Sequence, residues 1–132
     1  MRLYSHADCV SHQTPEGHPE RSDRLAFLLA HLEQTGFTQD HPVLEASPIQ
    51  DELVRQAHHP QLLARLRQSS PDEGLTPLDP DTWMGPASMA AALQAAGSVW
   101  QGVTDVAAGG ETRVFCAVRP PGHHAEFDSP MG

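Results

Sequence analysis

The sequence has few basic residues and no long apolar segment. Eight arginines stand against 17 acidic residues among its 132 positions, giving a formal charge of −9, and the arginines are scattered singly. Nucleic-acid binding requires basic side chains gathered in a stripe that neutralises phosphates, so we expect no direct nucleic-acid partner. No apolar run approaches the roughly 20 residues that span a bilayer, so we expect no membrane protein.

Cysteine is also scarce, because only Cys9 and Cys116 occur. Two cysteines are too few for a disulfide scaffold, and no signal peptide begins the chain at Met1. We therefore expect a protein of the reducing cytoplasm. The length fits one ordinary domain, and a hydrophobic share of 39% suits a packed core.

Apolar periodicity predicts short strands that alternate with helices. Residues 2–4 and 43–46 are predicted strands, and the polar stretch at residues 5–20 is a predicted loop. Leucines spaced as on a helix predict a helix over residues 19–35, with Pro19 in its first turn and Gly36 at its end. Two shorter helices are predicted around residues 49–57 and 62–66, the first ending before Pro60.

The second half combines a long loop, a long helix and a buried strand. Four prolines predict a loop over residues 69–86. Helical spacing then predicts a buried apolar face on the next helix, made by Met89, Leu93, Ala96, Trp100, Val103 and Ala107. The continuous apolar run at residues 113–118 is typical of a parallel strand buried on both faces. This order of elements predicts an α/β fold.

Two adjacent histidines, His123 and His124, directly follow this last strand. They therefore lie at the carboxyl end of a central strand, where open α/β sheets place their active sites. Pro120, Pro121 and Gly122 restrict the backbone before them, and proton transfer requires such fixed placement. One ring can accept a proton while the other donates one. Ordinary loop histidines are the alternative, but the restricted backbone and the buried strand favour the catalytic interpretation.

The run AVRPPGHHAEFDSPMG at residues 117–132 resembles the active-site signature of the zinc-dependent histone deacetylase superfamily, in its class II and bacterial form. GHPERSDRL at residues 17–25 and LDPDTWMGPASMAAALQAAG at residues 78–97 are similar to earlier segments of that family, in the same order. The resemblance covers nearly the whole chain and departs from the family at Leu62, Ser22 and Asp23. It implies an α/β fold: the N-terminal part of an arginase/deacetylase-type three-layer fold with a mostly parallel sheet.

The resemblance also implies a reaction, the hydrolysis of the acetyl amide of acetyl-lysine or of an acetylated polyamine or small amine. In that reaction zinc polarises the carbonyl and activates water, and a histidine pair transfers protons. By position, His124 is implied as the main proton shuttle, His123 as its partner, and Gly132 as part of the substrate tunnel. Asp79 and Asp81 lie in a loop that skirts the tunnel mouth in the family. An acidic rim there would attract a cationic substrate; a solvated loop is the alternative.

The zinc ligands of the family, an Asp-x-His pair and a second aspartate, follow the tunnel glycine and are not among these 132 residues. We therefore predict no metal ligand in this chain and interpret residues 1–132 as the N-terminal portion of one deacetylase domain. Alone, it is expected to be inactive. The alternative is a non-catalytic fragment or partner-binding module that keeps half of the fold. Coding sequence beyond Gly132 that supplies the ligands and a late tyrosine would favour the enzyme.

Four further side chains that can bind metals lie within thirteen positions, namely His6, Cys9, His12 and His18. The spacing of Cys9 and His12 is that of half a zinc site, but no second pair accompanies them. Loop and capping roles are therefore favoured over a structural metal. His58 and His59 lie at a predicted helix end, where a cation is stabilised, and a structural role is favoured there too.

Overall fold

Three short strands form a parallel sheet in the order β2-β1-β5. The computed structural model describes residues 1–132 and places β1 (Arg2–Tyr4) in the middle of this sheet. β2 (Val43–Leu44) pairs with one side of β1, and β5 (Val114–Cys116) pairs with the other. Leu3, opposite Val43 and Phe115, is completely buried, so the centre of the sheet is also the centre of the core.

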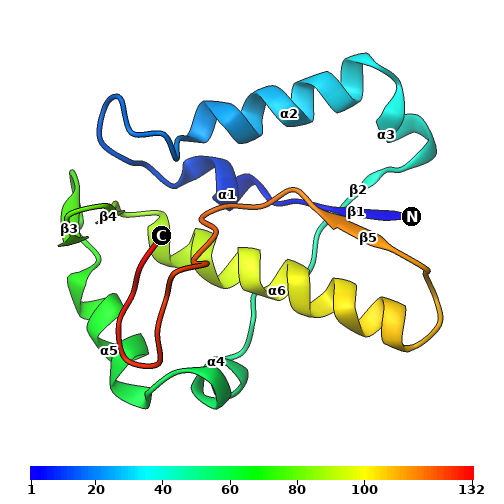
Figure 1. Ribbon diagram of the computed structural model, residues 1–132. Coiled ribbons are helices and arrows are strands. Elements are labelled where there is room, and N and C mark those ends of the chain that lie inside the picture. Colours follow the sequence, from blue (N-terminus) through cyan, green and yellow to red (C-terminus); the bar gives the residue numbers. More distant parts are fainter.

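Helices lie on both sides of this sheet. In Figure 1, α2 (Ser22–Gln34) lies above the strands and α6 (Ser88–Ala107) below them. The core between them consists of Leu3, Cys9, Leu25, Ala95 and Ala117. This arrangement confirms the predicted α/β class and parallel sheet. None of the helices combines the length and apolar character that crossing a membrane requires.

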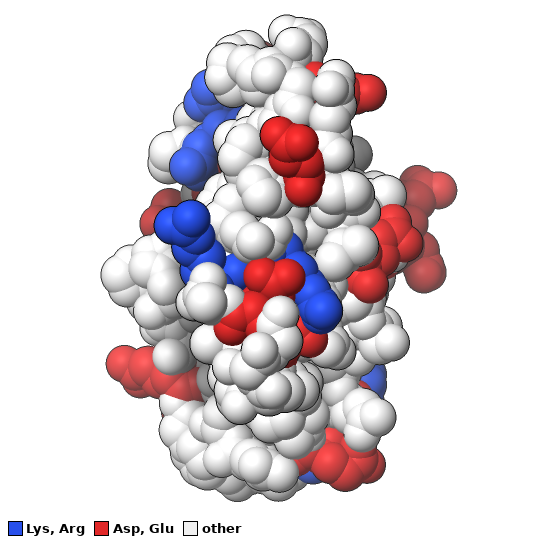
Figure 2. Space-filling model, turned by 90° about the vertical axis from the view of Figure 1, so that its right-hand side faces the viewer, with Lys and Arg blue, Asp and Glu red and all other residues white.

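The remaining elements connect these layers. A short helix, α1 (Ala7–Ser11), follows β1 and lies against both α2 and α6. α3 (Phe37–Asp40) leads into β2, and α4 (Asp51–Ala57) and α5 (Pro60–Ser69) follow as the two predicted short helices. An antiparallel hairpin of β3 (Thr76–Asp79) and β4 (Thr82–Met84) then precedes α6. On the face shown in Figure 2, basic side chains lie beside acidic ones and form no continuous stripe.

The predicted strands at residues 43–46 and 113–118 are shorter in the structure, and the start of α2 and two unpredicted elements also differ from the sequence prediction. α2 begins at Ser22, because the residues before it are held in a loop by hydrogen bonds that Thr14 and His18 make to Glu20. The polar stretch at residues 5–20 contains α1, whose N-terminus is capped by His6. The long loop contains the β3–β4 hairpin. This hairpin has no clear sequence pattern, because its strands are short, one contains a proline, and their register shifts at residues 77–79.

Two burial predictions were wrong. β5 is an edge strand in this chain, so Phe115 is 40% exposed rather than buried on both faces. The predicted buried face of α6 is largely exposed, with Trp100 at 51% and Val103 at 62%. Small residues face the sheet instead, since a Cβ on Gly102 would lie 2.9 Å from Val114 Cγ1 and a larger side chain has no room there.

Candidate functional site

The segment after β5 folds back on itself and closes into a loop. The Gly122 amide donates a 2.6 Å hydrogen bond to the Gly132 carbonyl, and the Ala125 amide donates to the Gly122 carbonyl. Gly122 and Gly132 have φ angles of 61° and 74°, in the left-handed region that favours glycine. The two ends of this loop therefore meet, and glycine at both ends makes the closure possible.

The two adjacent histidines lie together on this loop. The ring centroids of His123 and His124 are 4.0 Å apart, with planes inclined at 46°, and both residues are exposed. A Cβ on Gly132 would lie 3.6 Å from His123 Nδ1 and from His124 Cδ2. The fold thus brings three predicted site residues together at the end of β5, while their chemical roles remain predictions.

The β3–β4 hairpin contacts the end of the same loop. The Gly132 amide donates a 3.1 Å hydrogen bond to Thr82 Oγ1. Asp79 Oδ1 accepts a 2.7 Å hydrogen bond from the Asp81 amide, which together with a hydrogen bond from Thr82 lowers the pKa of Asp79. Asp81 Oδ1 lies 3.2 Å from His18 Nε2. Both predicted rim carboxylates therefore have local structural contacts, with Asp81 directed at His18.

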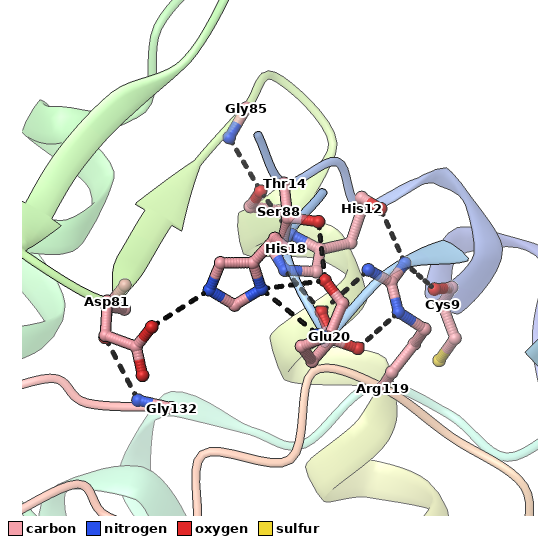
Figure 3. A network of polar contacts seen from close by, with 11 residues as sticks. Cys9, His12, Thr14, His18, Glu20, Asp81, Gly85, Ser88, Arg119 and Gly132 are labelled. Carbon is pink, nitrogen blue, oxygen red and sulfur yellow. Dashed lines mark hydrogen bonds and ion pairs between the residues drawn. The ribbon is translucent and has the colours of Figure 1, made fainter. Parts of the chain in front are cut away.

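A buried arginine fixes the start of the loop. The Arg119 side chain is only 5% exposed and binds the Glu20 carboxylate with two hydrogen bonds, of 2.6 Å from Nε and 2.8 Å from Nη2. Its Nη1 also donates to the carbonyls of Cys9, at 2.9 Å, and His12, at 2.5 Å. Figure 3 shows this guanidinium enclosed by the N-terminal segment. Such a paired arrangement is how a buried charge is tolerated.

His12 extends the network to the start of α6. Its Nδ1 lies 2.6 Å from Ser88 Oγ, and Ser88 Oγ accepts a 2.8 Å hydrogen bond from the Gly85 amide. The His12 ring is thus hydrogen bonded to Ser88 through Nδ1, and its Nε2 lies 3.6 Å from Glu20 Oε2. Burial and the nearby Arg119 charge lower the pKa of His12 to about 4. The ring is neutral at pH 7.

His18 joins the same network to the hairpin (Figure 3). Its Nδ1 lies 3.0 Å from the Glu20 carbonyl oxygen, to which the protonated ring donates, and its Nε2 faces Asp81. Burial alone would lower the pKa of His18, but hydrogen bonds to Glu20 and Asp81 outweigh that effect and raise it. Segments from three parts of the chain therefore converge around the loop that carries the histidine pair.

Several members of this network carry no local signal in the sequence that reveals their contacts. Glu20, Ser88 and Arg119 each lie in one of the three segments that resemble the family, but Arg119 contacts Glu20 across 99 positions and the Cys9 carbonyl across 110. One local signal was available. An arginine at the end of an apolar strand is seldom buried without a partner, so the position of Arg119 predicts a carboxylate partner elsewhere in the chain.

Three other histidines, His6, His58 and His59, have structural contacts. His6 Nδ1 accepts from the Asp8 amide and caps α1, and His59 Nδ1 accepts from the Gln61 amide and caps α5. His58 Nδ1 lies 2.9 Å from the Glu126 carbonyl. The expected capping role is confirmed for His6. His58 and His59 have structural contacts as predicted, but His59 caps a helix N-terminus as an acceptor instead of stabilising a helix C-terminus as a cation.

The side chains of residues 1–132 do not form a zinc site. No group of three or more His, Cys, Asp or Glu side chains is placed to hold a metal ion. Cys9 illustrates the reason, since its thiol is buried and directed at the Ala91 carbonyl, 4.0 Å away. A catalytic zinc needs about three protein ligands, and this chain does not assemble them.

Comparison with known proteins identifies the family. Residues 18–132 match the family model of the histone deacetylase domain. The chain belongs to the histone deacetylase family. It is 34% identical to histone deacetylase 5 of Arabidopsis thaliana over 98% of the chain and 21% of that protein. It is 32% identical to the histone deacetylase-like amidohydrolase of Pseudomonas aeruginosa, over 88% of the chain and 30% of that protein.

A solved structure extends the likeness to the fold. The crystal structure of the HDA15 HD domain superposes with a TM-score of 0.91 at 29% identity, covering 99% of this chain and 38% of that one. The predicted deacetylase-type fold is confirmed. The deacetylase segment described here spans less than two fifths of each of these three proteins.

The buried His12 predicts a loss of stability in mild acid. Its pKa is about 4 in the folded chain and 6.5 in the unfolded one, so its contribution is complete above pH 6.5. As the pH falls from 6.5 to 4, the unfolded chain takes up a proton that the folded chain refuses, and up to about 3 kcal/mol of unfolding free energy is lost. Urea denaturation at pH 7 and pH 4.5 measures this loss.

The matched control for this prediction is a His12→Gln variant, which cannot titrate. Its stability should change much less between the two pH values. The carboxylates with lowered pKa values, Asp51, Asp79 and Asp105, reduce stability mainly when they are protonated, below about pH 4. Equal losses in wild type and variant would show that His12 is not the group responsible.

Proposed function

We propose that this segment supplies the proton-transfer residues of a deacetylase that hydrolyses the acetyl amide of acetyl-lysine or of an acetylated polyamine or small amine. One observation carries the proposal: two imidazoles lie side by side next to Gly132, at the carboxyl end of a parallel strand, in a chain of the histone deacetylase family. Open α/β sheets use this end of the sheet for catalysis.

Amide hydrolysis needs two proton transfers. A base accepts the proton of the attacking water, and an acid then protonates the departing amine. With ring centroids 4.0 Å apart, His123 and His124 can both reach one substrate, so one ring can accept a proton while the other donates one. We assign His124 as the main shuttle and His123 as the partner that stabilises its charge.

Two contacts would keep this pair in place. Arg119 anchors the loop on the core side through Glu20, and Gly132 anchors it to the hairpin through Thr82. Gly132 has no side chain to fill the space beside both rings, where a Cβ would lie 3.6 Å from each of them. Zinc, the metal of the family, would polarise the acetyl carbonyl when bound, and its ligands would have to lie outside residues 1–132.

The β3–β4 hairpin carries a carboxylate, Asp81, that favours a positively charged substrate. Asp81 is exposed and carries one of the acidic charges in a chain of net charge −9, which favours substrates with a positive charge near the acetyl amide. Its contact with His18 neutralises part of that charge when His18 is protonated. A polyamine or a lysine-rich peptide would meet this requirement.

The second candidate is a non-catalytic, partner-binding segment with half of the deacetylase fold. It is favoured by the missing group of metal ligands in residues 1–132. The two candidates differ in what happens when the rest of a deacetylase domain is supplied.

The test is a chimeric domain in which this chain replaces the matched 30% of the Pseudomonas aeruginosa amidohydrolase. Acetate release is measured with an acetyl-lysine peptide and with an acetylated polyamine, beside the parent amidohydrolase. We expect activity from the zinc-loaded chimera and none from the 132-residue chain alone. A folded chimera that hydrolyses neither substrate supports the non-catalytic candidate, and zinc-dependent hydrolysis by the chain alone contradicts the expected need for outside ligands.

A further inference from the structure

The tip of the loop that carries the histidine pair lies against α4 and α5 (Figure 1). His58 Nδ1 lies 2.9 Å from the Glu126 carbonyl oxygen, and the His59 amide donates a 2.7 Å hydrogen bond to the Phe127 carbonyl. The next carbonyl along the loop accepts a hydrogen bond from the Arg65 guanidinium. Three consecutive carbonyls are therefore each bound by a donor from one corner of the fold, here called the α4–α5 corner (His58, His59 and Arg65).

The sequence of the α4–α5 corner explains why a backbone donor is available there. Pro60 follows the two histidines, and the residue before a proline avoids the helical conformation. α4 therefore ends at Ala57, and His58 and His59 are extended, with ψ angles of 153° and 134°. In a continuous helix the His59 amide would bind the carbonyl of Arg55, four positions back. The break between the helices leaves this amide to bind the loop instead.

His58 contributes the side-chain donor of the two histidines. A backbone carbonyl only accepts hydrogen bonds, so the Nδ1 atom of His58 must carry a proton whether the ring is neutral or charged. The His59 ring instead packs edge-on against Phe127, with centroids 5.7 Å apart and planes at 87°. Its own Nδ1 is occupied by the cap of α5. His58 is therefore the histidine whose side chain binds the loop by a hydrogen bond.

The α4–α5 corner is well supported, whereas the loop has little support of its own. Leu62 and Leu63 bury one side of α5, with only 4% and 3% of their surfaces exposed. Residues 121–129 are exposed apart from the half-buried Ala125. A segment with so few buried contacts depends on its hydrogen bonds to keep its position. Position matters for catalysis, because a misplacement of 1 Å can lower the rate about 100-fold.

We propose that His58 is a positioning residue for the proton-transfer pair. Its hydrogen bond to the Glu126 carbonyl holds the loop just after His124, as the buried Arg119 holds it before His123. With both sides of the pair fixed, the two rings stay where a substrate can reach them. The proposal rests on the proposed function, because it requires that this pair transfers protons.

The test compares two His58 variants in the chimeric domain described above. His58→Asn keeps an N–H donor close to the position of Nδ1, whereas His58→Leu removes the donor and keeps a similar volume. We expect kcat to fall at least about tenfold in His58→Leu with little change in KM, and to stay within about threefold of the parent chimera in His58→Asn. His31→Leu, which replaces an exposed histidine on α2, is the matched control and should leave kcat unchanged.

A second measurement, on the chain itself, needs no activity. Amide hydrogen exchange of His59 reports on its hydrogen bond to Phe127, and exchange of Ala117, whose amide donates to the Tyr4 carbonyl at 2.8 Å, reports on the core. We expect His58→Leu to accelerate exchange at His59 at least about tenfold with Ala117 unchanged. His58→Asn should exchange as slowly as wild type at both positions.

A kcat in His58→Leu equal to that of the parent chimera, or equal losses of kcat in His58→Leu and His58→Asn, would overturn the proposal. Unchanged exchange at His59 in His58→Leu would overturn it as well. If the parent chimera is itself inactive while exchange at His59 responds as expected, the anchoring of the loop by His58 is supported and only the proposed function fails.

Discussion

Replacing Arg119 with methionine is expected to destabilise the folded chain by about 3 to 5 kcal/mol, the typical cost of removing one partner from a buried ion pair. The substitution keeps an unbranched side chain of similar length, so the cost reflects lost charge and hydrogen bonds rather than a cavity. Glu20 loses both hydrogen bonds from Arg119, of 2.6 and 2.8 Å, and the Cys9 and His12 carbonyls lose a donor. Urea denaturation at pH 7 measures the difference.

The control is Arg67→Met, because Arg67 also binds a carboxylate with two hydrogen bonds, those to Asp51 at 2.7 Å, but is exposed. Exposed pairs contribute up to about 1 kcal/mol, so this variant should be nearly as stable as wild type. Adding Glu20→Leu to Arg119→Met should restore part of the loss, since no uncompensated carboxylate remains. If Arg119→Met costs no more than Arg67→Met, the buried pair is not what anchors the loop.

Removing Arg119 should also change His12. The positive charge of Arg119 is, after burial, the second-largest cause that lowers the pKa of His12 to about 4. Without that charge, and with Glu20 still present at 3.6 Å, the pKa of His12 should move upward. NMR chemical shifts of the imidazole protons recorded against pH test this. An unchanged pKa of His12 in the variant would show that the charge of Arg119 does not influence it.

Local periodicity predicted most of the elements. The leucine spacing located α2, the prolines separated α4 from α5, and the apolar run located β5. These signals arise within a few neighbouring residues, so one sequence suffices to read them. The β3–β4 hairpin was not predicted, because its strands are only four and three residues long and one contains Pro77.

The wrong burial prediction for α6 has a different cause. Apolar spacing predicts that a helix face is buried but does not say against which part of a protein, and here Trp100 and Val103 face outward from this chain. The candidate site shows the same limit. The motif letters placed His123 and His124 after a strand, whereas the contacts of Arg119 with Glu20 depend on packing between segments 99 positions apart. Long-range pairs of this kind leave no periodic signal.

In a complete domain containing this segment, His124→Asn is expected to lower kcat by about 10² to 10⁴, the usual contribution of a positioned proton-transfer group. Asparagine is similar in size and can hydrogen bond, but it cannot carry a proton between water and amine. kcat and kcat/KM should fall together, because the interaction lost belongs to the transition state. His123→Asn should cost less, since His123 acts through its neighbour across a 4.0 Å centroid separation.

The exposed His31 on α2 provides the matched control, since it lies outside the loop that carries the pair. His31→Asn should leave kcat unchanged in the chimeric domain, assayed with the same acetyl-lysine peptide. A double His123→Asn/His124→Asn variant should lose little more than His124→Asn alone, because residues that act as one unit are not additive. Full activity of His124→Asn, or a larger loss from His123→Asn, would reverse the roles assigned to the two rings. The structure allows either assignment, because both rings are exposed and both lie beside Gly132.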